Sequence, residues 1–254
     1  MEQLKDVVKA IVRRTGYKIS RCDQITDDEF RRRALIKNHG IDSVVDVGAN
    51  QGQYASELRR CGYKGEILSF EPLSEAYEAL QKTALADPEW HVFHSAIGAQ
   101  DGEAEINVAA NSVSSSLLPM LETHLRNAPT SRYRATERVK VSTLDSALKD
   151  VLPSGRRVLL KIDTQGYERE VLAGAKSVLQ NVHLLECELS LVPLYEGQAL
   201  LIEMLVLLDH LGFQSVYFAP GFGDQKSGHC LQLDGTFARV ARVPAHGKNG
   251  CHGG

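Results

Sequence analysis

The chain has 254 residues, of which 43% are hydrophobic and 24% are charged, and its formal net charge is −3. This composition is typical of one soluble α/β domain with a sizeable core, and it lacks the excess of positive charge that nucleic-acid binding needs. Five scattered cysteines without a C-x-x-C pair indicate reduced thiols, and the first residues lack the apolar core of a signal peptide. We therefore expect a cytoplasmic protein without a nucleic-acid partner.

Residues 1–40 form a predicted helical extension ahead of the first strand. Apolar residues mark one helix face at i, i+3, i+4, i+7 and i+8, namely Leu4, Val7, Val8, Ile11 and Val12. The rest of that helix carries the basic residues Lys5, Lys9, Arg13 and Arg14. We interpret it as a helix that packs on the domain; the alternative is peripheral contact of residues 1–15 with a membrane surface or a partner. A second helix is expected over Asp27–Asn38.

A glycine turn follows the first predicted strand, Ser43–Val47, and leads into a helix over Gln53–Cys61. Gly48 and Gly52 let the backbone approach a ligand, with the helix N-terminus aimed at it. The G-x-x-x-G spacing lacks a glycine of the dinucleotide fingerprint, and no P-loop lysine follows. Asp46, just before the turn, favours a ligand with a cationic end. S-adenosylmethionine (SAM), which carries an ammonium and a sulfonium, fits this description.

An acid also ends the second predicted strand, Glu66–Phe70. Glu71 lies 23 residues after Gly48 and is followed by a proline that stops the strand. An acid near this offset typically binds the ribose hydroxyls of an adenosine cofactor. The alternative is an ordinary βαβ unit with a surface glutamate.

The alternation of strands and helices breaks after a helix from Ser74 and a third strand, Trp90–His94. Ser95 and Ala96 place small groups where a flat adenine fits, although a plain strand end has the same composition. Additional strands are predicted over Glu103–Ala109 and Arg138–Ser142.

The insertion between these extra strands is polar. It contains the run Asn111–Ser116 and a predicted short helix near Leu117–Arg126. Connections of this length are usually functional or structured. Ser115 and Ser116 are candidates for hydrogen bonds to a polyhydroxy acceptor; a solvated turn is the alternative.

A second strand with an acid at its corner follows at Arg157–Ile162, and a helix begins near Tyr167. Ligands in open α/β sheets bind outside the carboxyl ends of strands, which places Asp163 at the site. Val182–Glu188 is the next predicted strand. By the two-residue period, and if the two strands pair, one lysine and three acids gather on one face: Lys161, Asp163, Glu186 and Glu188. This cluster is catalytic, clamps sugar hydroxyls, binds a metal, or is a structural ion-pair network.

The final elements are an apolar helix over Gln198–Leu211 and strands over Phe213–Phe218 and Leu231–Arg239. The glycine-rich loop between these strands suggests a lid, with His229 as a candidate base. The tail, residues 244–254, is predicted to be disordered.

Several motifs, taken in this order, resemble the FkbM family of SAM-dependent methyltransferases over residues 40–240: VVDVGANQGQY, SFEP, HSAIGAQDG, SSSL, VSTLD, LLKIDTQGYE with VLAGA, and LLECELS. The resemblance implies a class I methyltransferase (Rossmann-like) fold, α/β, with a doubly wound, mostly parallel seven-stranded sheet. It also implies O-methyl transfer, often onto sugar or polyketide hydroxyls. The basic N-terminal helix resembles the subset that methylates sugars of bacterial glycolipids. Gln165 stands where the family commonly has an acid.

These observations predict a methyltransferase domain over residues 41–243 with the following site residues. The cofactor, SAM, is expected at Asp46, Gly48, Asn50, Gly52, Tyr54, Glu71, Ser95 and Ala96. The acceptor is expected at Ser115, Ser116, Lys161, Glu186 and Glu188.

The predicted reaction is methyl transfer from SAM to a hydroxyl of a carbohydrate, including a glycolipid sugar. An alcohol is a poor nucleophile until its proton leaves, so a base is expected, with Asp163 as first choice and His229 as second. A divalent metal in the acid cluster is the alternative to a base, and we do not predict it. The rival functions are methylation of a polyketide or other small-molecule hydroxyl, a non-catalytic SAM-binding protein, and a nicotinamide oxidoreductase.

Overall fold

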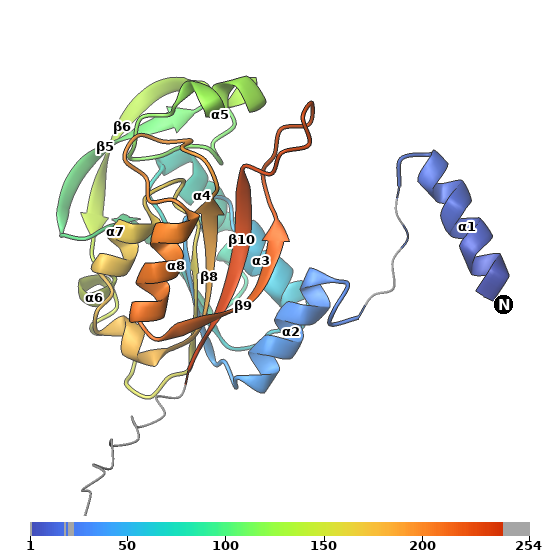
Figure 1. Cartoon of the computed structure of the whole chain (residues 1–254). Helices are drawn as coiled ribbons and strands as arrows, with labels where there is room; N and C mark the ends of the chain where they lie inside the picture. Colours follow the sequence, from blue (N-terminus) through green and yellow to red (C-terminus); the bar gives the residue numbers. More distant parts are fainter. Residues whose placement is uncertain (1, 18, 20–22, 241–254) are drawn as a thin grey trace, which may run out of the picture.

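The computed structural model describes residues 2–17, 19 and 23–240, and a seven-stranded sheet in the order β3-β2-β1-β7-β8-β10-β9 forms its centre (Figure 1). The strands are β1 (Ser43–Val47), β2 (Glu66–Glu71), β3 (Trp90–His94), β7 (Val158–Ile162), β8 (Val182–Ser190), β9 (Phe213–Pro220) and β10 (Gln232–Arg239). Neighbouring strands are parallel, except that β10 runs antiparallel to both β8 and β9. The predicted doubly wound, mostly parallel sheet is confirmed.

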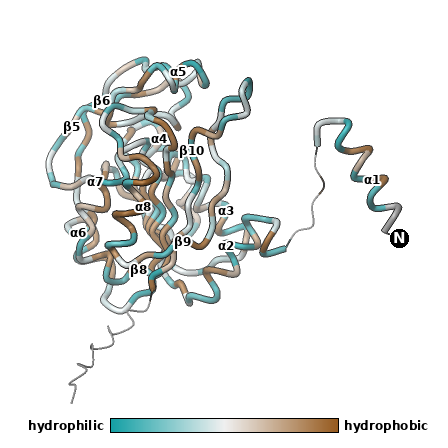
Figure 2. The backbone as a smooth tube through the Cα atoms, in the orientation of Figure 1, coloured by the Kyte–Doolittle hydropathy of each residue, from teal (hydrophilic) through white to brown (hydrophobic). Residues whose placement is uncertain are grey.

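Helices cover both faces of this sheet, so that its central strands are buried on both sides. The helices of the domain are α2 (Asp28–Asn38), α3 (Gln53–Arg60), α4 (Ser74–Ala84), α5 (Glu122–Asn127), α6 (Leu144–Ala147), α7 (Glu168–Ala173) and α8 (Leu201–His210), with 3₁₀ turns at Pro129–Ser131 and Val178–Asn181. Alternate residues of β1 enter opposite core clusters: Val44 packs with α3 and α4, whereas Val45 and Val47 pack with α7 and α8. Figure 2 shows the hydrophobic residues gathered along these central strands.

The additional strands, together with a short strand after β3, form a second sheet of three strands in the order β4-β6-β5. It lies on the upper side of the domain in Figure 1. Its strands are β4 (Ala96–Ile97), β5 (Gly102–Ala109) and β6 (Tyr133–Ser142). It has its own apolar cluster, in which Ile106, Val108 and Val139 pack with Leu73 and Ala76 at the start of α4. The two additional strands are therefore confirmed, and β6 begins five residues earlier than predicted.

The N-terminal helix α1 (Glu2–Arg14) does not pack on the domain as we expected, and it stands apart in Figure 1. Its apolar side chains Val7, Val8 and Ile11 are 55%, 44% and 59% exposed. The flank of the sheet is covered by α2 instead, because Leu35 and Ile36 pack against the core there. No helix in the described part of the chain is long and apolar enough to cross a membrane. The domain boundaries stay predictions, and the tail, 244–254, lies outside the described residues.

Candidate active site

A cavity of about 500 Å³ opens at the carboxyl ends of the central strands, where the strand order reverses between β1 and β7. The predicted site residues that line it are Gly48, Asn50, Tyr54, Glu71, Ser95, Ala96, Ser115, Lys161, Asp163, Glu186 and Glu188. The end near β1 and β2 holds the residues predicted for the cofactor. The end near β7, β8 and β10 holds most of those predicted for the acceptor and the chemistry.

The glycine turn after β1 is needed for packing of the protein chain against itself. Gly48 has φ +80°, and a Cβ on it would lie 1.9 Å from the backbone oxygen of Asp163. This glycine therefore lets the turn and the end of β7 meet, in addition to lining the cavity. Gly52 does not line the cavity: it caps α3 with φ +87°, and a Cβ there would lie 2.9 Å from the side chains of Leu80 and Trp90.

Glu71 presents a buried carboxylate to the cofactor end of the cavity. Its Oε2 accepts the backbone N–H of Asn50 at 2.8 Å, and its Oε1 accepts the backbone N–H of Leu73 at 2.9 Å. Burial raises the pKa of Glu71 to about 7, even though both N–H groups favour the charged form. Each carboxylate oxygen keeps a lone pair that can accept one more hydrogen bond. The two oxygens can therefore accept hydrogen bonds from the two hydroxyls of a ribose.

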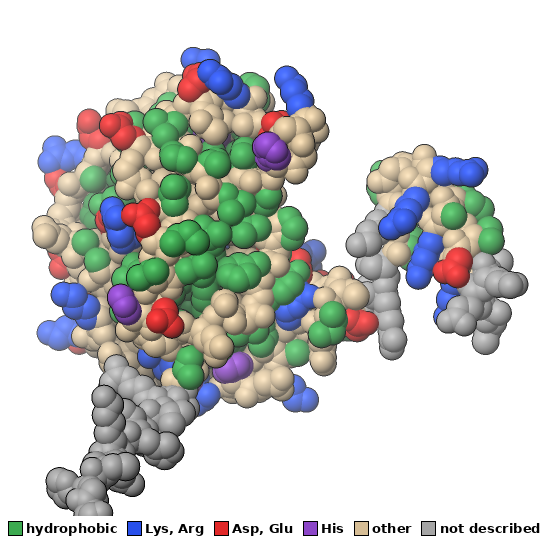
Figure 3. Space-filling model, viewed as in Figure 1, with side chains coloured by type: hydrophobic (Ala, Val, Ile, Leu, Met, Phe, Trp, Pro, Cys, Tyr) green, Lys and Arg blue, Asp and Glu red, His purple; other side chains and the backbone are tan. Residues whose placement is uncertain are grey.

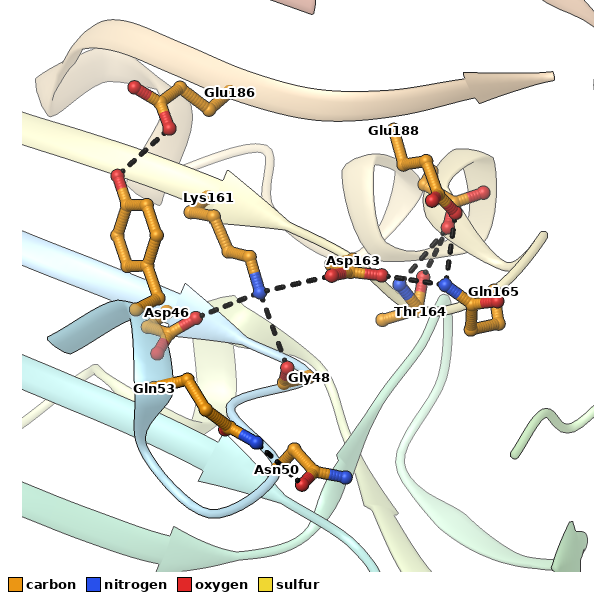
Figure 4. A network of polar contacts seen from close by, with 12 residues as sticks. Asp46, Gly48, Asn50, Gln53, Lys161, Asp163, Thr164, Gln165, Glu186 and Glu188 are labelled. Atoms are coloured by element: carbon orange, nitrogen blue, oxygen red, sulfur yellow. Dashed lines mark hydrogen bonds and ion pairs between the residues drawn. The ribbon is translucent and has the colours of Figure 1, made fainter. Parts of the chain in front are cut away.

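Lys161 joins the two acids that flank the glycine turn (Figure 4). Its Nζ lies 3.3 Å from Oδ1 of Asp46 and 3.4 Å from Oδ2 of Asp163, and it donates to the backbone oxygen of Gly48 at 3.3 Å. Burial acts to lower the pKa of Lys161, but the two carboxylates outweigh it and the pKa is raised. Asp46 is fully buried and does not line the cavity, so Lys161 occupies the position of the predicted ligand cation.

Asp163 is the accessible acid at the end of β7, with its side chain 41% exposed. Its Oδ1 accepts a hydrogen bond from Nε2 of Gln165 at 2.8 Å. Glu188 lies beside it, and its Oε2 accepts from Gln165 at 3.0 Å and from Gln232 at 2.7 Å. Burial, followed by the charge of Asp163, raises the pKa of Glu188 well above its ordinary value.

Glu186 separates from the predicted cluster, although it lies beside Lys161 in the β7–β8 register. Both of its oxygens accept from Nε of Arg32, at 3.1 and 3.2 Å, and the hydroxyl of Tyr54 donates to it at 3.0 Å. Arg32 also binds Glu57 of α3 at 2.5 Å. Of the residues in the predicted cluster, Glu186 thus belongs to an ion-pair network with Arg32, whereas Asp163 is accessible from the cavity.

Helix α2 and strand β9 also contribute to this cavity, which was not predicted from the sequence. The guanidinium of Arg31 lies 3.4 Å above the ring centroid of Tyr217, and both residues line the cavity. Asp234 of β10 lines it too, opposite Glu188 in the antiparallel register. Three consecutive arginines in α2, residues 31–33, are the signal that could have drawn attention to this helix.

Besides Asp46 and Gly52, two further predicted residues lie away from the cavity wall. Ser116 is buried, and its hydroxyl donates to the backbone oxygen of Gln165 at 2.7 Å, so it supports the loop after β7. His229 is exposed in the hairpin loop between β9 and β10 and does not line the cavity, which removes its basis as a base. In the described part of the chain, no group of three His, Cys, Asp or Glu residues is placed to hold a metal ion.

The reversed strand β10 in an otherwise parallel seven-stranded sheet, with a glycine turn and an acid at the ends of β1 and β2, defines a class I SAM-dependent methyltransferase. Residues 46–215, more than half of the chain, match the methyltransferase FkbM domain family. The protein belongs to this family, as the motifs indicated.

The chain is similar to solved structures of methyltransferases at low sequence identity. One is a SAM-dependent methyltransferase from Aquifex aeolicus, with 13% identity, a TM-score of 0.42, and coverage of 84% of this chain and 90% of that one. Another is an rRNA methylase from Streptococcus thermophilus, with 8% identity, a TM-score of 0.47, and coverage of 88% and 100%. No curated protein matches the chain. The absence of a nucleic-acid partner stays a prediction.

Proposed function

We propose that this methyltransferase acts on a hydroxyl of a carbohydrate and that Asp163 is its base. The observation that carries the proposal is the carboxylate of Asp163, which is accessible from the cavity and held on both oxygens, by Lys161 and by Gln165. A base must lie within hydrogen-bond reach of the proton that it removes. The carboxylate of Asp163 is fixed at the carboxyl end of β7, where an acceptor in the cavity can reach it.

The chemistry divides between the ligand and the protein. When bound, SAM supplies an activated methyl group, which the acceptor oxygen takes as the carbon–sulfur bond breaks and its electrons stay on sulfur. Glu71 and the turn at Gly48 and Asn50 hold the cofactor. Asp163 accepts the hydroxyl proton, and the cavity walls align the acceptor.

A sugar is favoured over other alcohols by the residues around Asp163. Glu188, Asp234 and Ser115 line this end of the cavity and can each accept a hydrogen bond from a hydroxyl. The acidic surroundings disfavour an anionic acceptor.

We further propose that the acceptor is lipid-linked and that the protein binds it at the cytoplasmic face of a membrane. Exposed Val7, Val8 and Ile11 form an apolar side of α1, and Figure 3 shows basic side chains beside hydrophobic ones on this helix. The exposed basic residues are Lys5, Lys9, Arg13 and Arg14. Each basic residue near an anionic membrane contributes about 1 kcal/mol, enough in sum for reversible attachment.

Turnover of labelled SAM with a soluble glycoside, a glycolipid and a polyketide alcohol tests the function. We expect methylation of a glycoside or glycolipid, and a fall in kcat of about 10²–10⁴-fold in Asp163→Asn with little change in SAM affinity. Asp150→Asn, at an exposed position outside the cavity wall, is the matched control. Turnover on the polyketide alcohol alone would refute the sugar assignment. SAM binding without any turnover would identify a non-catalytic protein.

A further inference from the structure

Gln165 occupies a constrained position in the loop between β7 and α7. Its φ is +55°, which is uncommon for a residue other than glycine, and Gly166 continues the left-handed turn with φ +98°. The hydroxyl of buried Ser116 donates to its backbone oxygen. The backbone is therefore held in a conformation that sends this one side chain toward the two acids of the cavity.

The amide of Gln165 has partners on both of its sides. Its Oε1 accepts the hydroxyl of Tyr195 at 2.8 Å, and Tyr195 is fully buried. Its Nε2 donates to Asp163 at 2.8 Å and to Glu188 at 3.0 Å, so that the amide lies between the two carboxylates (Figure 4). Because the hydroxyl of Tyr195 donates to Oε1, the oxygen of the amide faces the tyrosine and its NH₂ group faces the two acids.

We propose that Gln165 is a positioning residue for methyl transfer, which holds the carboxylate of Asp163 in the orientation that receives the acceptor's proton. Tyr195, behind it, fixes the orientation of the amide. This inference rests on the proposed function, because Asp163 is the base in that function.

The charges around Asp163 explain why a neutral donor suits this position. The titratable groups that face Asp163 from the surrounding elements are Asp46, Lys161, Glu168, Cys187, Glu188, Tyr195 and Asp234. Of the described residues, Lys161 alone forms an ion pair with Asp163, and it is shared with Asp46. An amide adds two hydrogen bonds to the acids without adding charge. A carboxylate, which the family commonly has at this position, would place an acceptor beside Asp163 and lose the hydrogen bond that the amide donates to it.

The decisive variant is therefore Gln165→Glu, which keeps the size of the side chain and replaces the donor by an acceptor. We expect the single-turnover rate constant to fall by about 10²-fold, which is the effect of misplacing a reacting group by about 1 Å. The acidic limb of the pH–rate profile should move to higher pH, because the new carboxylate disfavours ionisation of its neighbours. SAM affinity, measured by calorimetry, should stay within about twofold. A purely structural role would lower the melting temperature without moving the pH limb.

Gln232→Glu is the matched control. Gln232 also donates to Glu188, at 2.7 Å, but it makes no hydrogen bond to Asp163. It introduces the same charge beside Glu188, so a smaller fall in kcat than in Gln165→Glu assigns the difference to the contact with Asp163. Equal falls in the two variants would overturn the inference.

Tyr195→Phe tests the same network without a new charge, should Gln165→Glu fail to fold. Loss of the hydroxyl that orients the amide should lower kcat about 3- to 10-fold, in line with one hydrogen bond, and leave SAM affinity unchanged. Unchanged kcat and pH profile in a folded variant would overturn the inference while wild-type turnover keeps the proposed function. Wild-type protein that binds SAM but methylates no hydroxyl would instead refute the proposed function.

Discussion

The buried carboxylate of Glu71 should lower the stability of the ligand-free protein above about pH 7. Its pKa is raised from an ordinary 4.5 to about 7 by burial. The folded protein therefore holds a proton that the unfolded chain releases between these values, and the free energy of unfolding falls as the pH rises through this window. A shift of this size corresponds to about 3 kcal/mol, lost in full above pH 7.

Glu71→Gln isolates this effect because the amide does not titrate. The variant keeps an acceptor for only one of the N–H groups of Asn50 and Leu73, at a cost of about 1–3 kcal/mol that does not depend on pH. Glu168, whose pKa is also raised to about 7 by burial, titrates in both proteins and cancels. Relative to wild type, the variant should therefore gain about 3 kcal/mol between pH 4.5 and pH 8.

Urea unfolding at closely spaced pH values measures the difference. Glu78→Gln, at an exposed position of the same helix α4 that follows Glu71, is the control and should run parallel to wild type. Stability curves of wild type and Glu71→Gln that also run parallel would refute the raised pKa. Calorimetry should show the opposite trend in function, with SAM bound at least about tenfold more weakly by the variant, since each lost charge-assisted bond is worth about 1.5–3 kcal/mol.

Three further predictions concern packing and the N-terminus. Gly48→Ala should lower the free energy of unfolding by at least about 3 kcal/mol, because it adds a clash with backbone to left-handed strain, whereas Gly62→Ala, with a similar left-handed φ of +87° and open space around it, should cost only about 1–2 kcal/mol in urea unfolding. Arg32→Ala should cost about 3 kcal/mol by leaving Glu186 without its cation, and the added change Glu186→Gln should restore part of this in a double-mutant cycle. Deletion of residues 2–15 should leave the melting temperature unchanged and abolish flotation with anionic liposomes; a drop in melting temperature, with no flotation of the intact protein, would show that the helix packs on the domain instead.

The sheet was predictable from the sequence because its strands are short apolar runs bounded by glycine, proline or acids. The core strand Ser43–Val47 was predicted with its observed bounds, and Trp90–His94 likewise. The start of β6 was not, because residues 133–137 are exposed or half-buried and lack the sustained alternation of apolar and polar residues that indicates a strand. The contacts of α1 could not be predicted from periodicity, since an amphipathic pattern indicates an apolar face but not the surface that covers it.

The position of a side chain at the cavity could be predicted where one strand end alone decides it, as at Glu71 and Asp163. It was not predictable where side chains choose among partners brought together by the fold. Lys161 and Glu186 are neighbours in register, yet Glu186 binds an arginine from α2, and Asp46 binds Lys161 where the cationic end of a ligand was expected. The sequence shows that Gln165 replaces the acid common in the family. Its hydrogen bonds to both Asp163 and Glu188 could not be predicted, because they depend on the pairing of β7 and β8.

The three-stranded sheet of the insertion has a consequence for how this enzyme can diversify. Its apolar cluster is separate from the two clusters of the main sheet, and its loop contributes Ser112, Val113 and Ser115 to the cavity wall. Glu71 and Gly48, which we propose hold the cofactor, belong to strands and turns outside it. Substitutions at Val113 and Ser115 can therefore reshape the cavity wall and change the acceptor, whereas Ser112, whose hydroxyl accepts from Nδ2 of Asn50 at 3.2 Å, ties the loop to the turn after β1 and limits such change.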